Sequence, residues 1–346
     1  MARPLPVRIG RYEVIQVLGQ GGMGTVFLAQ DPRLKRRVAI KVVRDPGGDA
    51  QERVLERFQR EAEISAQLNH PNVITVYDVG EDPEAGPFLA MEFVDGQSLA
   101  FLIRERRPGI EVGLVLLLQA MRGLQAAHDA GIIHRDVKPE NMLVSEDGRL
   151  KLMDFGLAKG DHARLTATGS VMGTPAFTAP ELMLGAEPSQ TTDRYAFYVT
   201  AFELLTGALP YKADSIGSTL YRIVHEPPTL PPDLAPPLRD LFTRALAKEP
   251  ATRPATLQAF LGELIQGITL PEAVQRKLSS YLDLEGLARP VPSPPPGPVE
   301  DASPTLAVSP RRATPPKGAR LPGLPSPRVA LPTPPPKPVG PRRPLF

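Results

Sequence analysis

The chain has 346 residues, 42% of them hydrophobic and 23% charged, with a net charge of +2. This length allows one large domain or two ordinary ones with an added tail, and so small a net charge does not indicate a nucleic-acid-binding protein. The sequence contains no cysteine, which excludes disulfides, thiolate metal sites and cysteine nucleophiles and is compatible with a reducing, cytoplasmic location.

Two parts follow one another before residue 289, after an N-terminal extension of residues 1–11. Alternating apolar residues predict a strand-rich part, residues 12–92, with strands at 12–18, 25–30, 38–43, 73–79 and 87–93 and one helix at about 51–68. Helical periodicity dominates from Ser98 onward, at 112–130, 193–206, 238–247 and 257–266. Gly131 and Gly207 stand where helices are expected to end. A further helical stretch, residues 269–288, caps the domain or begins a linker.

A glycine-rich loop follows the first predicted strand. Its residues are Gly19, Gln20, Gly21, Gly22, Met23 and Gly24, followed by Thr25 and Val26. Glycines permit a tight turn and let backbone N–H groups approach phosphate oxygens closely. The same spacing occurs in dinucleotide-binding loops, but those open a helix, whereas a strand follows here. An ordinary glycine hairpin is the remaining alternative.

Lys41 ends the apolar strand that contains Ala39. Its side chain either reaches solvent or holds phosphates. The next predicted helix carries Glu61 on its apolar stripe, and an inward-facing carboxylate needs a partner. Lys41 is the natural partner for Glu61.

Three further motifs identify a family. They are His134-Arg135-Asp136 with Asn141 five residues later, Asp154-Phe155-Gly156 and Ala179-Pro180-Glu181. Together with the glycine loop and Lys41, and in this order, they resemble the motifs of protein kinases. The loop Gly21–Gly24 and the segment His70-Pro71-Asn72-Val73 look most like the bacterial serine/threonine branch.

The resemblance implies an α+β, bilobal protein kinase fold over residues 12–268. A small β-rich lobe (12–92) carries one regulatory helix, and a larger, mainly helical lobe spans 96–268. It also implies transfer of the γ-phosphate of Mg-ATP to serine and threonine hydroxyls of protein substrates. ATP and Mg²⁺, with Mn²⁺ as an alternative, are the implied cofactors.

The resemblance also assigns roles. Asp136 accepts or orients the proton of the substrate hydroxyl, and Lys138 touches the γ-phosphate. Lys41, fixed by Glu61, holds the α- and β-phosphates, while Asp154 and Asn141 bind the metal ions. The residues expected around ATP are Leu18, Gly19, Gln20, Gly21, Gly22, Met23, Gly24, Val26, Ala39, Lys41, Met91, Glu92, Val94 and Leu143.

Within this set, Val26 and Ala39 form one wall for the adenine and Leu143 the other, with Leu18 at the rim. The hinge segment Met91-Glu92-Phe93-Val94 pairs with the adenine edge through its backbone. Taken singly, each apolar residue here fits a core position equally well.

Regulation by phosphorylation is expected in the segment between Asp154 and Glu181. Thr166 and Thr168 are predicted autophosphorylation sites, and Arg135 is the arginine that would receive the phosphate. The alternative is that both threonines are only polar loop residues. A transient homodimer is expected if one molecule phosphorylates another. Thr174 matches the position whose hydroxyl supports Asp136 in serine/threonine kinases. Lys138 is also typical of the serine/threonine class.

Other family positions are retained or changed. Glu181 is expected to pair with Arg253, and Asp193 to brace the catalytic loop. Ala196, Tyr198 and Phe177 depart from the serine, glycine and tyrosine usual at their positions, which leaves local packing, but not phosphate chemistry, open.

Residues 289–346 form a proline-rich tail. They hold 20 of the chain's 42 prolines and nine Lys/Arg against Glu300 and Asp301. Such a segment buries too little apolar surface to fold alone, so we predict a disordered, basic tail. It serves as a spacer or docks partners with aromatic grooves.

The alternative to an active kinase is a catalytically silent pseudokinase scaffold with a partner-docking tail. A pseudokinase scaffold usually lacks Lys41, Asp136 or Asp154, and this chain has all three. Residues 1–12 lack an apolar core, and the longest apolar run, near residues 114–118, is short of the ~20 residues of a spanning helix. No membrane segment is therefore expected in this chain.

Overall fold

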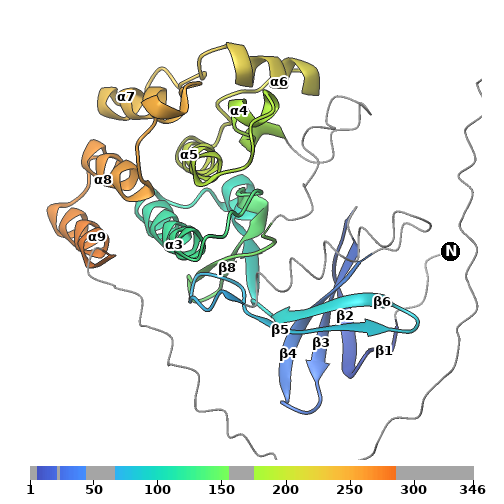
Figure 1. Ribbon diagram of the computed structural model, residues 1–346. Helices are drawn as coiled ribbons and strands as arrows, with labels where there is room; N and C mark the ends of the chain where they lie inside the picture. The colour runs from blue at the N-terminus through green and yellow to red at the C-terminus, as the bar shows by residue number, and fades with distance from the viewer. Residues whose placement is uncertain (1–5, 22–23, 44–66, 156–174, 286–346) are drawn as a thin grey trace, which may run out of the picture. The chain divides into compact units, whose positions relative to one another are not determined.

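A computed structural model describes residues 6–21, 24–43, 67–155 and 175–285 (Figure 1). All of these residues belong to the first of two compact units, residues 1–290 and 291–346. The predicted helix at 51–68, except for its last two residues, and the proline-rich tail beyond residue 289 lie outside the described residues.

The first part of the described chain is an antiparallel sheet with the strand order β1-β2-β3-β4-β6-β5, drawn in blue to cyan in Figure 1. Its strands are β1 (Arg8–Ile9), β2 (Tyr12–Gly21), β3 (Gly24–Asp31), β4 (Arg36–Val43), β5 (Val76–Asp82) and β6 (Gly86–Glu92). The predicted strands are thus present, and β2 continues into the glycine loop.

The predicted strand at 73–79 is wrong at its start, since β5 begins only at Val76. The residues before it pair elsewhere: Val73 forms a parallel bridge with Leu152, and the Ile74 amide donates to the Leu152 carbonyl at 2.8 Å. Their backbone groups are therefore occupied by another strand, which an apolar pattern alone does not indicate.

The short strand β1 precedes the expected start of the domain at residue 12. Ile9 is fully buried, and the Gly10 amide donates to Asp82 Oδ2 at 2.7 Å. Part of the predicted N-terminal extension is therefore a strand of the sheet. Two residues are too few to show a period of two, so the sequence pattern did not indicate it.

Side chains of the sheet point alternately to two apolar clusters. Val38 and Ile40 of β4 pack with Tyr12 and Phe88 in one cluster, whereas Ala39 packs with residues such as Met91 in the other. Because successive side chains of a strand face opposite sides, Lys41 shares the face of Ala39. The sheet thus directs the lysine toward the predicted adenine-binding residues.

The second part is mainly helical. Its helices are α2 (Leu99–Phe101), α3 (Ile110–Asp129), α4 (Pro180–Met183), α5 (Gln190–Thr206), α6 (Ile216–His225), α7 (Pro236–Ala245), α8 (Leu257–Gly267) and α9 (Glu272–Glu285), with short turns η1 (Leu102–Arg106), η2 (Pro139–Asn141), η5 (Pro175–Phe177) and η6 (Pro250–Thr252). A small sheet of β7 (Gly96–Ser98), β8 (Met142–Ser145) and β9 (Leu150–Leu152) completes it. These findings agree with the predicted α+β, bilobal kinase fold.

Helix ends follow the expected chemistry. Ser189 caps α5 in a reciprocal capping box with Thr192, and α5 ends at Gly207 with φ 71°. Gly131, just after α3, has φ 75°. Both glycines therefore take the left-handed conformation that the sequence predicted for them.

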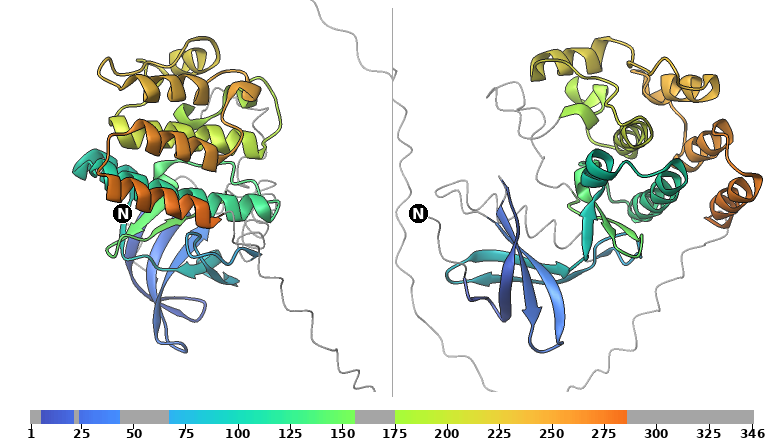
Figure 2. Two further views of the ribbon diagram at one scale, coloured as in Figure 1. Left: turned by 90° about the vertical axis from the view of Figure 1, so that its left-hand side faces the viewer. Right: turned by 180° about the vertical axis from the view of Figure 1, so that it is seen from behind.

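Helix α3 is the one helix in the described ranges that is long and apolar enough, by length and composition, to cross a membrane. Leu114, Leu117 and Leu124 are nevertheless fully buried in the core of the helical part. On its other side α3 is partly covered by α9, which also packs against α8 (Figure 2). In this chain α3 is a core helix.

Tyr198, which replaces a glycine usual in kinases, is accommodated in this core. It is fully buried, its hydroxyl donates to the Pro254 carbonyl at 3.0 Å, and its ring centroid lies 4.4 Å from that of Phe260. Burial raises its pKa well above the usual value. The larger side chain therefore finds both apolar and polar partners.

Arg253 and Glu181 form the predicted pair. Two bonds of 2.7 Å join the guanidinium to the carboxylate, and the arginine also donates to the carbonyls of Ala247 and Lys248. The Arg253 side chain is only 1% exposed. The pair ties α4 to the segment between α7 and α8, as the sequence predicted.

We expect Arg253→Met to lower the free energy of unfolding by about 3–5 kcal/mol, because it leaves the Glu181 carboxylate without its buried partner. Arg244→Met is the control, since its pair with Glu263 is 43% exposed on both sides and should contribute about 0–1 kcal/mol. Urea unfolding of both variants measures the difference. Equal losses would contradict the assignment.

Candidate active site

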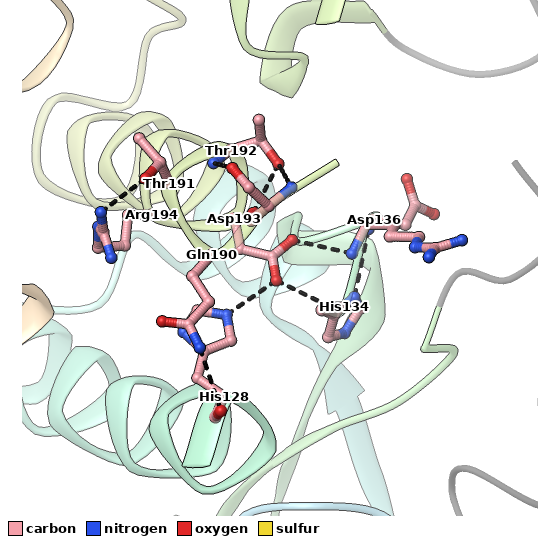
Figure 3. A network of polar contacts seen from close by, with 10 residues as sticks. His128, His134, Asp136, Gln190, Thr191, Thr192, Asp193 and Arg194 are labelled. Carbon is pink, nitrogen blue, oxygen red and sulfur yellow. Dashed lines mark hydrogen bonds and ion pairs between the residues drawn. The ribbon is translucent and has the colours of Figure 1, made fainter. Parts of the chain in front are cut away.

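Asp193 holds the loop between α3 and β8 in place (Figure 3). Its carboxylate accepts hydrogen bonds from the amides of His134, at 2.7 Å, and Arg135, at 2.8 Å. Arg135 itself has φ 67°, a costly conformation for a non-glycine residue that surrounding contacts must maintain. The predicted brace is confirmed.

His128 is part of the same network and was missed by sequence reasoning. Its Nε2 atom lies 2.9 Å from Asp193 Oδ2 and donates to the carboxylate, while Gln190 donates to the His128 carbonyl. A histidine in the last turn of the helix just before His134 was the available signal. Burial lowers the pKa of His134, and the ring packs 4.5 Å from Phe155.

Asp136, Lys138 and Asn141 lie together in this loop. Lys138 Nζ donates to Asp136 Oδ2 at 2.7 Å, and Asn141 Nδ2 donates to the same oxygen at 2.9 Å. Asn141 Nδ2 also donates to the Asp136 carbonyl at 2.9 Å. With its nitrogen oriented in this way, the amide oxygen of Asn141 is the atom suited to a cation.

Lys41 and Asp154 form the second group. Lys41 Nζ lies 2.6 Å from Asp154 Oδ1, and the lysine is 8% exposed. The Met153 amide donates to the Asn141 carbonyl at 3.0 Å, which links this group to the first. Asp154 has φ 56°. The expected partner Glu61 lies outside the described residues, and so do Thr166, Thr168 and Thr174.

The predicted adenine-binding residues gather in one apolar cluster. Ala39, Ile74, Leu89 and Met91 are buried there, with Val26, Val43, Val76, Val94, Leu143 and Met153 packed against them. Five of the residues expected around ATP are thus brought together from strands β3, β4, β6 and β8 and from the segment after β6. Leu18 is 43% exposed beside the glycine loop.

The glycine loop needs glycine for two different reasons. At Gly24, with φ 152°, an added Cβ would lie 2.0 Å from the Val42 carbonyl oxygen, so only glycine fits. At Gly19 and Gly21 an added Cβ would meet nothing within 4 Å. Within the described part of the chain there is no steric reason for glycine at these two positions, which agrees with close approach by a ligand. Gly22 and Met23 lie outside the described residues.

A small cavity of about 20 Å³ borders Asp136 on the side of α4 and α5. Its lining includes Lys138, Thr178 and Leu182, of which the last two were not singled out from the sequence. A larger groove, about 830 Å³, lies between η1, α3 and α9 and contains none of the predicted site residues. The larger groove is therefore separate from the predicted site residues.

Comparison with known families agrees with this geometry. The family model of the protein kinase domain matches residues 12–264. The chain belongs to the protein kinase family. Members of this family use ATP and a divalent metal, and the oxygen donors of Asn141 and Asp154 suit a hard cation that shares its remaining positions with phosphates and water.

Several proteins similar to this chain are bacterial serine/threonine-protein kinases. PknA of Mycobacterium tuberculosis is 42% identical over 251 residues, which cover 70% of this chain and 58% of PknA. Pkn3 of Myxococcus xanthus is 38% identical over 316 residues, or 85% of this chain and 57% of Pkn3. The chain therefore spans less than three fifths of the curated relatives it matches.

Among solved structures, the kinase domain of Mycobacterium tuberculosis PknI is similar, with a TM-score of 0.60 and 31% identity. The match covers 78% of this chain and all of the PknI kinase domain chain. This supports the bilobal kinase fold.

Glu203 of α5 adds a titrating group to the kinase domain. Burial raises its pKa to about 7, with a further contribution from the nearby Glu140 and an opposing one from Arg104. Because the folded-state pKa is raised, the fold favours the protonated form. Stability contributed by this group is present below the unfolded pKa of ~4.3 and is lost as pH rises to about 7.

We therefore expect Glu203→Gln to be more stable than the wild type at pH 8, by about 1 kcal/mol after allowance for partial exposure, or ~2–4 °C in Tm. At pH 4.5 the difference should vanish. Thermal unfolding across this range measures it, with the exposed Glu187→Gln as control. A constant difference at all pH values would show that titration is not its cause.

Proposed function

We propose that this kinase transfers the γ-phosphate of Mg-ATP to serine and threonine hydroxyls of protein substrates. The observation that carries the proposal is the joint placement of Asp136, Lys138 and Asn141 beside a lysine and an aspartate, Lys41 and Asp154, that the sheet and β9 present together. Phosphoryl transfer requires positioning and charge neutralisation more than covalent chemistry, and these groups provide both.

Each group has a role in this proposal. Asp136 accepts the hydrogen bond of the substrate hydroxyl and takes its proton as the new O–P bond forms and the bond to ADP breaks. Lys138 neutralises charge on the transferred phosphate, and Lys41 orients the α- and β-phosphates. Asn141 and Asp154 would hold the divalent metal, which supplies further neutralisation when bound.

The test is incubation of the purified chain with labelled ATP and Mg²⁺, followed by phosphoamino acid analysis. We expect label on serine or threonine but not tyrosine, its loss on addition of EDTA, and partial recovery with Mn²⁺. ATP binding without any transfer would favour the alternative, a pseudokinase scaffold.

Activation-loop autophosphorylation is part of the proposal. A phosphate on Thr166 or Thr168 adds about −2 charge, and Arg135 offers a guanidinium at the base of the catalytic loop. Replacing both threonines by alanine is expected to lower kcat at least tenfold and to reduce bound phosphate, measured by intact mass spectrometry. Full activity with unchanged phosphate would reject these sites. Autophosphorylation between molecules would make the initial rate depend on protein concentration, as a transient homodimer predicts.

Two further expectations remain proposals. ATP-dependent transfer requires a compartment that holds ATP, so we propose a cytoplasmic location, tested by cell fractionation. The basic proline-rich tail acts as a spacer or docks partners. Deletion of residues 289–346 should leave peptide phosphorylation intact whether the tail is a spacer or a docking segment. Loss of partner binding on deletion would show that the tail docks partners.

A further inference from the structure

Lys151 of β9 forms an ion pair with the hinge. Its Nζ atom lies 2.8 Å from Glu92 Oε2, and the two side chains are 14% and 24% exposed. Glu92 is the last residue of β6 and begins the expected adenine-binding hinge. Lys151 lies three residues before the proposed metal ligand Asp154. One ammonium group therefore connects the hinge to the strand that precedes Asp154.

The pair is part of a wider hydrogen-bonded connection. Lys151 Nζ also donates to the Val73 carbonyl at 3.4 Å. The Thr75 amide donates to Glu92 Oε2 at 3.3 Å, and the Glu92 amide donates to the Thr75 carbonyl at 2.9 Å. Residues 73–75 thus form a strip between hinge and β9, and the Lys151–Glu92 pair crosses it.

The far side of this strip is fixed to the helical part. The Leu152 amide donates to the Asn72 carbonyl at 2.8 Å, and Asn72 Nδ2 donates to Gln119 of α3 and to the Leu150 carbonyl. At Gly123 of α3 an added Cβ would lie 2.6 Å from the Asn72 carbonyl oxygen, so helix and strip are in close contact. β9 is consequently a rigid support.

The charges explain why the pair matters for the hinge. The Glu92 carboxylate is three-quarters buried, and a carboxylate in that position needs a cationic partner to remain there. Without the ammonium, the Glu92 carboxylate would gain hydration by turning outward, and the side-chain connection from the end of β6, where the proposed function places the adenine edge, to β9 would be lost. An exposed surface pair would have no such effect.

We propose that Lys151 is a positioning residue for nucleotide binding: by holding the Glu92 carboxylate it fixes the hinge backbone relative to β9 and Asp154. The inference rests on the proposed function only in placing ATP at this site. Lys151 itself does not touch the nucleotide, and its effect passes through Glu92.

The experiment compares ATP affinity and kinetics in Lys151→Gln, Lys151→Arg and Glu92→Gln with the wild type. We expect Lys151→Gln and Glu92→Gln each to raise the dissociation constant and KM for ATP about three- to tenfold, with kcat changed much less. The double variant should bind ATP no more weakly than either single variant, because both substitutions remove the same ion pair. Lys151→Arg should restore most of the affinity.

Arg149→Gln is the matched control. Arg149 also precedes Asp154 and is paired with Asp147, but its side chain is 74% exposed, and we expect unchanged ATP affinity. Tm values of all variants separate general destabilisation from the effect on the hinge. Unchanged ATP affinity in Lys151→Gln, or additive losses in the double variant, would overturn the inference. Absence of transfer in a wild type that binds ATP would instead overturn the proposed function alone.

Discussion

Asp136→Asn is expected to lower kcat for phosphoryl transfer by about 10²–10⁴-fold while ATP binding persists. The carboxylate is the one group of the catalytic loop positioned to take the hydroxyl proton, and Lys138 and Asn141 already orient it through bonds of 2.7 and 2.9 Å. Asparagine has nearly the same shape but cannot accept a proton. Single-turnover transfer from labelled ATP measures the chemical step directly.

Asp129→Asn provides the control for this substitution. Asp129 is exposed at the end of α3, where it accepts a hydrogen bond from Gln125, and its change should leave kcat unaltered. ATP affinity, measured in parallel, shows whether the Asp136 variant is folded. If kcat fell by less than tenfold, Asp136 would not be the proton acceptor. Catalysis would then depend on substrate positioning alone.

Local motifs predicted much of the site. The alternation of β4 places Lys41 on the face of Ala39, and Asp136 and Asn141, assigned to the site by one motif, are in contact within one loop. Such features depend on residues close together in the sequence, whose relative positions the local backbone conformation determines. Two contacts were predicted only from resemblance to the family: Glu181 with Arg253, and Asp193 with Arg135 of the catalytic loop. Their partners lie 72 and 58 residues apart, too far for a local pattern to indicate them.

Other contacts could not be predicted because they depend on tertiary packing. The bridge between Val73 and Leu152 displaced the start of β5, and the strands β7, β8 and β9 have three or four residues each, too few for a periodic signal. Lys151 belongs to no motif and lies 59 positions after Glu92, which the sequence placed in the hinge. A lysine in a strand as short as β9 is expected to be exposed to solvent unless the fold is known.

Asp193→Ala is expected to be strongly destabilising, with a loss of about 3–5 kcal/mol in the free energy of unfolding. It removes a carboxylate that is 2% exposed and leaves three donors, the amides of His134 and Arg135 and the ring of His128, without their acceptor. Asp193→Asn should lose less, because its one amide oxygen can still serve part of this set.

The Asp193 substitutions should also lower kcat in the molecules that remain folded. Arg135 holds its left-handed conformation through the bond from its amide to Asp193, and Asp136 follows it directly. Below the Tm of each variant we therefore expect kcat to fall in the order wild type, Asp193→Asn, Asp193→Ala, with little change in ATP affinity. The exposed Asp240→Ala on α7 should match the wild type. If the folded Asp193→Ala variant kept wild-type kcat, the carboxylate would stabilise the helical part without positioning the catalytic loop.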